Sequence, residues 1–298
     1  MKYLVTGGAG FIGNNIIREL IKEGHSVTVI DNLHSGRMEN LQDIRGLIDF
    51  EKIDIRDYEK TKIILKGIDG IFHEAALTSV PESYLKQEEY FDVNVKGTEN
   101  IFKIAKKENI KVVYASSSSI YGDSKNFPIK ENSDKNPLNP YGETKLEDEK
   151  IAEEFVKDGL RVVGLRYFNV YGIGQTGTYA GVVTQFLKKI RERNPLIING
   201  DGDQERDFIH VKDVAKANIR AMESSTDFGF LNIGTGKTIS INKLAQLMIE
   251  LSGIKLEVIH GPPMQGDIFK SQADTRLTEN TIHWKFEIEL EEGLKDFF

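Results

Sequence analysis

The chain has 298 residues, 39% of them hydrophobic and 29% charged, and its 46 acidic and 39 basic residues give a net charge of −7. This length suits one large or two fused domains, and the acidic balance argues against nucleic acid or an anionic membrane as a partner. Cysteine is absent, which excludes disulfides, thiolate metal sites and cysteine nucleophiles and favours a cytoplasmic location.

The first half of the chain alternates between short β-rich runs and helical patterns. Strands are predicted at residues 3–6, 27–30, 49–53, 70–73, 112–115 and 161–166. Helices are predicted near residues 10–23, 58–66, 91–108 and 141–157. This alternation predicts an α/β fold of the Rossmann type, a doubly wound parallel sheet with helices on both faces.

Beyond residue 166 the pattern changes, with more glycine and polar turns between helices predicted near residues 181–193, 211–224 and 241–252. The sequence therefore predicts a dinucleotide-binding domain at 1–166 and a smaller α/β substrate-binding lobe at 167–298. A strand near 229–233 either belongs to this lobe or returns to the main sheet, and the sequence leaves these two alternatives open. No apolar run approaches the roughly 20 residues that span a bilayer, and the six histidines show no metal-ligand spacing, so no metal is expected.

A glycine-rich loop, GGAGFIG at residues 7–13, directly follows the first predicted strand and opens a helix. Glycines at 7, 10 and 13 allow a sharp turn and a close approach of the backbone to a pyrophosphate. The anion would lie at the helix N-terminus, where unpaired N–H groups face it. The spacing is a variant of the dinucleotide-binding loop.

An acidic residue follows at the end of the second predicted strand. Asp31 stands where an acid accepts hydrogen bonds from an adenosine ribose, and its charge repels a 2′-phosphate. NAD is therefore favoured over NADP, with Arg37 nearby as an opposing charge. Asp54 and Ile55 follow the third strand, where an adenine edge is expected, although Asp54 is equally interpreted as a turn residue.

Three separate segments carry candidate catalytic side chains. Tyr141 and Lys145 stand four residues apart on one helical face. A run of four serines, at 116–119, ends the fifth predicted strand, and Asn169 follows the sixth. A phenol with a pKa of about 10 is a poor base at neutral pH, but an adjacent ammonium favours the phenolate. A serine hydroxyl can hold the same substrate oxygen.

These motifs resemble those of the extended short-chain dehydrogenases/reductases, within the NAD-dependent epimerase/dehydratase family, and most of all the UDP-glucose (UDP-galactose) 4-epimerases. The resemblance runs over essentially the whole chain. The segments that carry it are VTGGAGFIG at 5–13, DNL at 31–33, HEAA at 73–76, SSSSIYG at 116–122, PYGETK at 140–145, RYFNVYG at 166–172 and GDGDQERDF at 200–208.

The resemblance implies inversion at C4 of a UDP-hexose through a transient 4-keto sugar, with NAD as the cofactor. It implies Ser117, Tyr141 and Lys145 as catalytic residues. The implied cofactor-binding residues are Gly7, Gly10, Phe11, Ile12, Gly13, Asp31, Asn32, Asp54, Ile55, Ala75, Tyr141 and Lys145. The implied substrate-binding residues are Ser117, Asn169, Arg206, Asp267 and Ser271. It also implies a homodimer through the helices at 91–108 and 141–157.

One departure from the family pattern concerns the late Gly-Asp motif. The family's second arginine falls on Met264, so the site is more weakly cationic, or Arg276 compensates, or the nucleotide differs. Ser271 is small, which leaves room for an N-acetyl group at C2 of the sugar and adds UDP-GlcNAc/UDP-GalNAc to UDP-glucose/UDP-galactose.

Two alternative functions stay open. A nucleotide-sugar 4,6-dehydratase, or another NAD-dependent enzyme that modifies sugar nucleotides, shares these motifs. A dehydratase of this group carries Asp-Glu where this chain has Ser118 and Ser119, which disfavours that reading. A non-catalytic NAD-binding sensor is the more distant alternative, because such proteins usually lose the tyrosine or the lysine.

Overall fold

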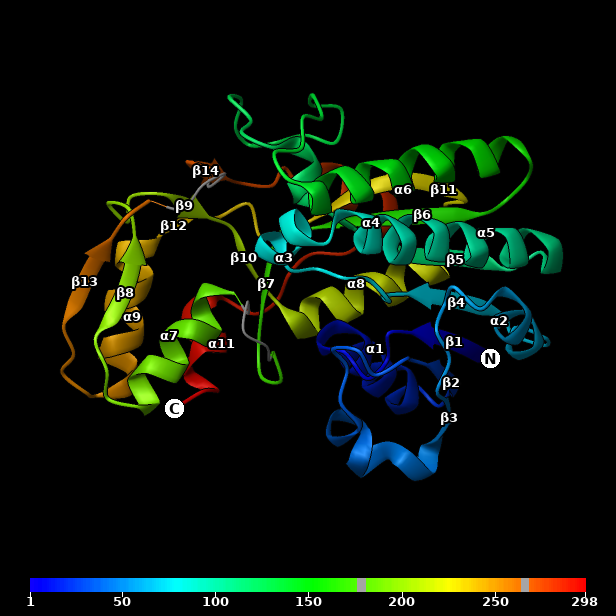
Figure 1. Cartoon of the computed structure of the whole chain (residues 1–298), viewed down its shortest axis with the longest axis horizontal. Helices are drawn as coiled ribbons and strands as arrows, with labels where there is room; N and C mark the ends of the chain where they lie inside the picture. The colour runs from blue at the N-terminus through cyan, green and yellow to red at the C-terminus, as the bar shows by residue number, and fades with distance from the viewer. Residues whose placement is uncertain (176–180, 264–267) are drawn as a thin grey trace.

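The structure is a computed structural model of the whole chain and describes residues 1–175, 181–263 and 268–298 (Figure 1). The strands are β1 (Lys2–Thr6), β2 (Ser26–Ile30), β3 (Ile48–Glu51), β4 (Gly70–His73), β5 (Lys111–Ser117), β6 (Val162–Tyr167), β7 (Asn169–Tyr171), β8 (Leu196–Asn199), β9 (Glu205–Arg206), β10 (Phe208–His210), β11 (Phe228–Ile233), β12 (Ile239–Ser240), β13 (Val258–Gly261) and β14 (Lys270–Ser271). The α-helices are α1 (Phe11–Lys22), α2 (Tyr58–Ile64), α3 (Val80–Leu85), α4 (Gln87–Tyr90), α5 (Gly97–Glu108), α6 (Pro140–Lys157), α7 (Val182–Arg191), α8 (Val211–Glu223), α9 (Ile241–Ser252), α10 (Arg276–Ile282) and α11 (Leu290–Lys295). The 3₁₀-helices η1 (Met38–Leu47) and η3 (Ser118–Tyr121) and the π-helix η2 (Phe91–Lys96) complete the described elements.

The centre of the molecule is a seven-stranded parallel sheet with the order β11-β6-β5-β4-β1-β2-β3. Both faces are covered, by α1 and α8 on one side and by α2, α5 and α6 on the other (Figure 1). Along β1 the side chains alternate between the two resulting cores, because Tyr3 and Val5 face one core and Leu4 faces the other. This is the predicted Rossmann-type sheet.

The sheet has a topological switch point between β1 and β4. The chain moves outward from β1 to β2 and β3, and then returns to place β4 on the other side of β1. The connections on the two sides lead away from each other, so a crevice opens at the carboxyl ends of the central strands.

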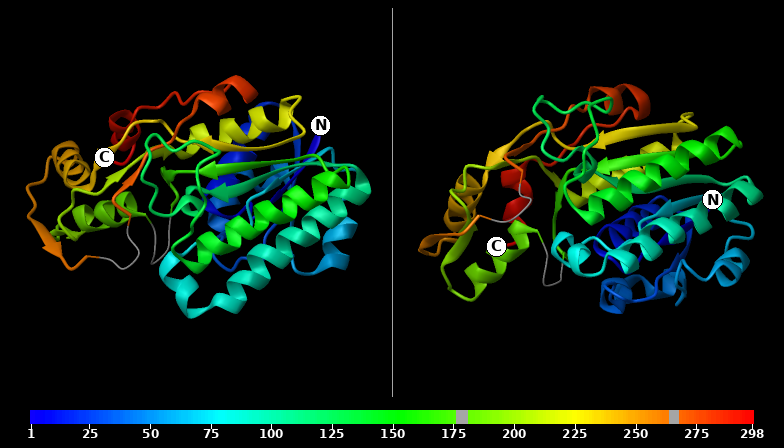
Figure 2. Two further views of the ribbon diagram at one scale, coloured as in Figure 1. Left: turned by 90° about the horizontal axis from the view of Figure 1, so that it is seen from above. Right: turned by 45° about the horizontal axis from the view of Figure 1, so that its top comes forward.

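A second lobe packs beside one end of the sheet domain (Figure 2). It contains the parallel pair β8–β13 and the small sheet β12-β9-β14, with α7, α9 and α11 around a separate core. Residues after 166 also serve the main sheet. β11 pairs with β6 at the edge of the sheet, with Asn232 opposite Arg166, and α8 packs against α1. The strand expected near 229–233 is thus part of the seven-stranded sheet.

The helix predicted at 91–108 differs from the observed one. The helical segment begins earlier, at Gln87, and its residues Phe91–Lys96 form a π-helix. Val93, Asn94 and Val95 of this segment are all buried. In the described ranges of the chain, no helix has both the length and the apolarity to cross a membrane.

Candidate active site

The loop between β1 and α1 lies against other backbone segments at distances that only glycine allows. A Cβ on Gly7, whose φ is +65°, would lie 2.7 Å from the backbone nitrogen of Ala75, and a Cβ on Gly13 would overlap the carbonyl oxygen of Gly7. Gly10 begins α1 without a side-chain cap, which leaves the first N–H groups of the helix to an external acceptor. The loop and the helix form a cradle that fits a pyrophosphate.

A cavity of about 420 Å³ opens in front of this loop, at the carboxyl edge of the sheet. The predicted site residues that line it are Gly7, Gly10, Phe11, Ile12, Gly13, Asp31, Asn32, Ile55, Ala75, Ser117, Tyr141 and Lys145. Four other predicted residues, Asp54, Asn169, Arg206 and Ser271, lie outside its lining. The structure therefore brings the glycine loop and the catalytic candidates to one cavity.

Asp31 directly follows β2 and lines one end of the cavity. Its carboxylate oxygens accept N–H bonds from Ala9 at 3.0 Å and from Leu33 at 2.7 Å. Burial raises the pKa of Asp31, and the two hydrogen bonds oppose that rise. A Cβ on Gly36 would lie 2.8 Å from Asp31 Oδ2, so glycine there keeps space beside the carboxylate. A carboxylate fixed at the end of β2 suits the hydroxyl groups of an adenosine ribose.

Asp54 is engaged by its neighbours. Its Oδ2 accepts hydrogen bonds from Arg56 at 2.7 Å and from Asn32 at 2.9 Å. The hydrogen bonds from Arg56 above all hold the pKa of this carboxyl well below its usual range. Ile55 and Arg56, rather than Asp54, line the cavity where adenine is expected, while Arg37 is exposed and outside that lining.

Ser117, Tyr141 and Lys145 line the other end of the cavity, next to the carboxyl ends of β5 and β6. The start of α6 is fixed by Asn139, whose side chain caps the helix. Tyr141 and Lys145 lie one turn apart on the face of α6 that borders the cavity. Ser117 is the last residue of β5, and its Oγ accepts the N–H of Ser119 at 3.1 Å, so its own proton is available to a ligand.

Lys145 is almost completely enclosed, with 3% of its surface exposed. Its Nζ lies 3.2 Å from Asp148 Oδ2. Burial by itself lowers the pKa of Lys145, but Asp148, Tyr141 and Glu74 together raise it above its usual value. The ammonium is thus kept charged beside the phenol of Tyr141, and a fixed cation there favours the phenolate.

A half-buried acid that the motifs did not indicate also lines this end of the cavity. Glu74 directly follows β4, and its Oε1 accepts a hydrogen bond from the Tyr167 hydroxyl at 2.9 Å. The side-chain amide of Asn218 donates to the same hydroxyl oxygen at 2.8 Å. An acid placed directly after a central strand was the available signal, but its tyrosine lies 93 residues away in sequence.

The π-helix holds α6 in place from the side. Asn94 donates to Thr144 Oγ1 at 3.0 Å and to the carbonyl oxygen of Leu77 at 2.9 Å, and it accepts the N–H of Leu77 at 2.8 Å. Thr144 is the residue before Lys145, so these bonds fix the helical turn that carries Tyr141 and Lys145. The signal in the sequence was a polar residue between two valines of a helical segment.

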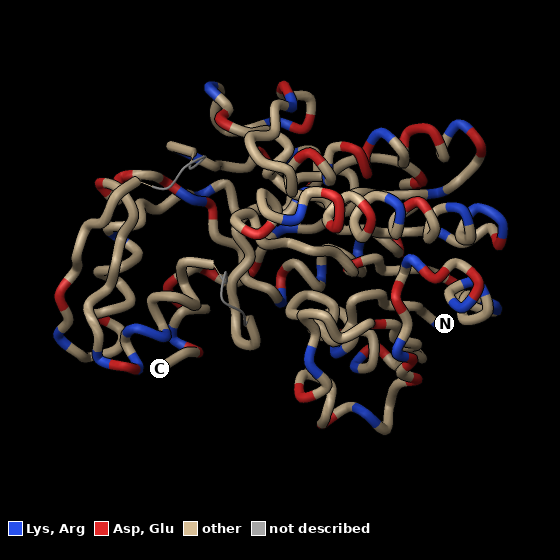
Figure 3. The backbone as a smooth tube through the Cα atoms, viewed as in Figure 1, with Lys and Arg blue, Asp and Glu red and all other residues tan. Residues whose placement is uncertain are grey.

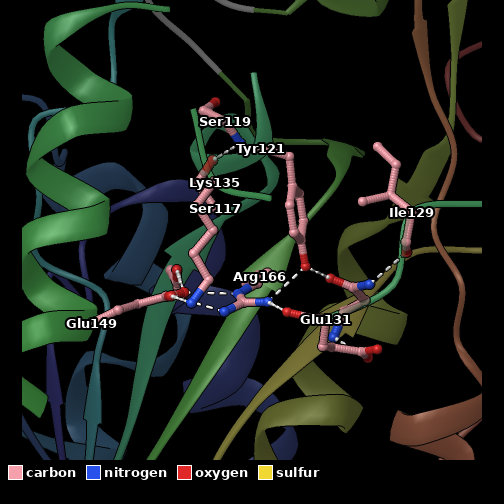
Figure 4. A network of polar contacts seen from close by, with 10 residues as sticks. Ser117, Ser119, Tyr121, Ile129, Glu131, Lys135, Glu149 and Arg166 are labelled. Atoms are coloured by element: carbon pink, nitrogen blue, oxygen red, sulfur yellow. Dashed lines mark hydrogen bonds and ion pairs between the residues drawn. The ribbon is translucent and has the colours of Figure 1, made fainter. Parts of the chain in front are cut away.

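A buried polar network reaches the residue before Ser117, because Ser116 is hydrogen-bonded to Glu149 (Figure 4). Arg166, which is 1% exposed, forms two hydrogen bonds of 2.8 Å with the carboxylate of Glu149 and one of 2.7 Å with the Tyr121 hydroxyl. The Ser116 hydroxyl donates to Glu149 at 2.7 Å. The network links β5, β6 and α6, the three elements whose ends carry the candidate catalytic residues.

The predicted substrate residues of the second lobe form a separate group. Arg206 on β9 lies in register with Ser271 on β14, and Ser271 is 3% exposed. The Asn169 amide donates to the carbonyl oxygen of Asp207 at 3.1 Å. Arg276 forms hydrogen bonds with Asp274 and has a 72% exposed side chain. Asp267, and Met264 at the position of the expected second arginine, lie outside the described residues.

Comparisons with known proteins agree with the family resemblance that the motifs indicate. The sequence profile of the NAD dependent epimerase/dehydratase family matches residues 3–234. A UDP-glucose 4-epimerase from Lactobacillus helveticus is 34% identical over 306 residues, which cover 96% of this chain and 92% of that protein.

Two solved structures match both lobes. The UDP-glucose 4-epimerase of Thermotoga maritima, solved with UDP-glucose, gives a TM-score of 0.95 at 36% identity and covers 99% of this chain and 96% of its own. A UDP-N-acetylglucosamine 4-epimerase from Methanobrevibacter ruminantium M1, solved with UDP-N-acetylmuramic acid, gives a TM-score of 0.95 at 38% identity with the same coverage of 99% and 96%.

Proposed function

We propose that this chain, which belongs to the NAD-dependent epimerase/dehydratase family, inverts the configuration at C4 of a UDP-hexose. The protein is an NAD-dependent epimerase, and NAD is its cofactor. The observation that carries the proposal is that Ser117, Tyr141 and Lys145 line the same cavity as the glycine cradle. A base and a bound dinucleotide that act at the same carbon can invert the configuration of that carbon with no net oxidation of the sugar.

The cavity lining supports a cofactor that extends from Asp31 past the glycine loop to Lys145. We propose that the glycine loop holds the pyrophosphate, that Asp31 holds the adenosine ribose, and that Lys145 holds the nicotinamide ribose. The other cavity-lining residues proposed to contact NAD are Phe11, Ile12, Asn32, Ile55, Ala75 and Tyr141. Asp54 is proposed to act behind them, through the hydrogen bond that it accepts from Asn32. Bound NAD supplies a group that accepts a hydride from the sugar and later returns it.

Tyr141 is the proposed base. Its phenolate removes the proton from the O4 hydroxyl as the hydrogen on C4 leaves with its electron pair, and a C4 carbonyl forms. Ser117 donates a hydrogen bond to O4 throughout, and the Lys145 ammonium stabilises the phenolate. Once the 4-keto sugar has turned its other face to the cofactor, the hydrogen returns to C4 with its electron pair and Tyr141 returns the proton to O4, which completes the inversion.

The second lobe is the proposed site for the nucleotide diphosphate. The guanidinium of Arg206 suits bidentate contacts with phosphate oxygens, and Asn169 and Asp267 are proposed to assist there. Ser271, in register with Arg206, is proposed to border the C2 substituent of the sugar. Its small side chain supports UDP-GlcNAc/UDP-GalNAc as substrates beside UDP-glucose/UDP-galactose. Residues 173–186 contain no lysine or arginine, which disfavours a uronic acid.

The alternative within the family is a nucleotide-sugar 4,6-dehydratase. That reaction removes water across C5 and C6 and needs an acid and a base at those carbons. Ser118 and Ser119 begin η3 directly after Ser117, and two serines there offer no carboxyl group. We therefore favour epimerisation. A sensor without turnover is disfavoured because both Tyr141 and Lys145 line the cavity.

The test is an incubation of the purified protein with UDP-glucose and, separately, with UDP-N-acetylglucosamine, followed by NMR of the anomeric protons. We expect new galacto-configured signals without added NAD. A 4-keto-6-deoxy product would establish the dehydratase instead. No change with either sugar, also after addition of NAD, would contradict the proposed substrates.

We also propose that the protein forms a homodimer through the outer faces of α5 and α6. These helices lie side by side on the surface of the sheet domain, and Phe91, just before α5, is 45% exposed. Charges of both signs alternate along the two helices (Figure 3), which permits complementary pairing across a two-fold axis. A monomeric mass by light scattering would contradict this proposal.

A further inference from the structure

The carboxyl group of Glu74 lines the cavity beside Tyr141 and Lys145, and the mechanism above gives it no task. It is held in a defined position. The Tyr167 hydroxyl donates to Oε1 at 2.9 Å, and Asn218 donates to that hydroxyl at 2.8 Å and to the carbonyl oxygen of Val214 at 2.9 Å. The acid therefore depends on β6 and α8 as well as on the end of its own strand.

The groups around Glu74 leave an unbalanced set of charges. From α6 it faces Lys145 and from β6 it faces Tyr167, while the strand that precedes it ends in His73. Lys145 in turn faces Asp148 and Tyr141. His73 is enclosed between hydrogen bonds with Thr6 and Thr98, and its pKa is lowered to about 3 by burial and then by Lys145, so it is neutral. The Lys145 ammonium is thus a single positive charge beside two carboxyl groups, those of Glu74 and Asp148.

We propose that Glu74 is the counter-charge to the oxidised nicotinamide ring, so that the site binds NAD⁺ in preference to NADH. The inference rests on the proposed function in one respect, that the nicotinamide lies at the Tyr141 end of the cavity. The ring is positive in NAD⁺ and neutral in NADH, so a carboxylate in a poorly solvated cavity stabilises the oxidised form selectively. Such a bias would keep the resting enzyme ready to accept the hydride of the sugar.

A dependence on pH follows, with a definite sign. Burial raises the pKa of Glu74 to about 7, against the effects of Tyr167 and Lys145. Glu74 is ionised above that pH and neutral below it, so the preference for NAD⁺ should grow as the pH rises. Burial also raises the pKa of Asp148 to about 7, and Asp148 therefore adds to the same trend. Removal of Glu74 should reduce the trend rather than abolish it.

The experiment measures which nucleotide the protein keeps. The purified protein is first freed of the nucleotide that it retains, then incubated with a large excess of equimolar NAD⁺ and NADH, passed rapidly through a desalting column and extracted with cold methanol. Chromatography gives the ratio of retained NAD⁺ to NADH at pH 6 and at pH 8. No sugar is present, so the result is independent of the substrate, and failure of epimerisation in the NMR test leaves it intact.

Glu74→Gln should lower this ratio at pH 8 by roughly five- to twenty-fold, the effect of one partly screened charge at a short distance. The rise in the ratio from pH 6 to pH 8 should fall to half or less. Glu74→Asp, which keeps the charge, should restore most of the preference. Glu89→Gln is the matched control, because Glu89 lines the same cavity near Arg56, and its ratio should stay within about twofold of the wild type.

A folded and loaded Glu74→Gln protein with the ratio of the wild type would overturn the proposal. If that variant binds neither nucleotide, Tyr167→Phe decides. It removes a hydrogen bond that lowers the pKa of Glu74 but keeps the carboxyl group, so the pH at which the preference develops should move upward. An unchanged midpoint in Tyr167→Phe would also overturn the proposal.

Discussion

The two ends of the proposed site are built in different ways. At the chemical end, Asn94 is fully buried, Lys145 is 3% exposed and Arg166 is 1% exposed. Asn94 and Arg166 form hydrogen bonds that cross from one element to another, and Lys145 pairs with Asp148 one turn along its own helix. At the nucleotide end, Arg206 lies on a strand of two residues and Arg276 has a 72% exposed side chain.

This difference separates two requirements of one enzyme. Proton transfer demands that donor and acceptor stay within hydrogen-bond distance, so its groups are fixed through several elements at once. The residues proposed to recognise the nucleotide sugar lie on short strands and on loops, and such residues can change without disturbing the sheet. We expect substitutions at the chemical end to affect rate and stability strongly, and substitutions at the nucleotide end to change the choice of substrate.

The largest effect is expected for Tyr141→Phe. Loss of the phenol should lower kcat for C4 epimerisation roughly 10³-fold, because the base that shuttles the O4 proton is gone. Bound NAD, measured by absorbance after extraction, should stay at the wild-type level. The matched control is Tyr84→Phe, which removes a hydroxyl from a 41% exposed tyrosine outside the cavity lining. Near-full activity in Tyr141→Phe would contradict the assigned base.

Arg166→Met tests whether the chemical end depends on its buried network. The change leaves the buried Glu149 carboxylate without the guanidinium that donates two hydrogen bonds to it. It should therefore lower the free energy of unfolding by about 3–5 kcal/mol. The control is Arg18→Met, because Arg18 pairs with Asp43 at the surface, where the side chains are 37% and 64% exposed. That change should cost less than about 1 kcal/mol. Equal urea midpoints for the two variants would show that the network is dispensable.

Gly13→Ala tests the cradle at the cofactor end. A Cβ there would overlap the carbonyl oxygen of Gly7, so the loop must shift, and we expect NAD to bind about tenfold more weakly. Gly46→Ala serves as the control, since a Cβ on Gly46 meets nothing within 4 Å. Calorimetric titration of both variants with NAD distinguishes them. Wild-type affinity in Gly13→Ala would rule out close packing as the reason for this glycine.

Ser271→Tyr should have the smallest effect on chemistry and act on specificity. The larger side chain would occupy the proposed space at C2 of the sugar, so kcat/KM for UDP-N-acetylglucosamine should fall roughly tenfold relative to UDP-glucose. Ser271→Ala keeps that space open and is the control. Because Ser271 is buried, thermal melts of both variants are needed to separate specificity from unfolding. An unchanged ratio of the two kcat/KM values would place the C2 pocket elsewhere.

Much of the chemical end could be predicted because its signals are local in sequence. The glycine spacing at 7, 10 and 13 describes one turn, and the spacing of Tyr141 and Lys145 describes one helical face. The polar supports escaped prediction because their partners are distant. Arg166 on β6 pairs with Glu149 on α6, and Glu74 pairs with Tyr167, which lies 93 residues away in sequence.

The amino-acid sequence by itself determined the alternation of strands and helices, the parallel sheet, and the glycine loop and the Tyr141–Lys145 pair that line the cavity, because periodicity and spacing are local properties. Tertiary structure alone decided that β11 returns to the edge of the main sheet, that a π-helical turn brings Asn94 to α6, and that Glu74 lines the cavity as a half-buried acid beside Lys145. Those features depend on which distant segments pack together, and burial then sets the charge of each group.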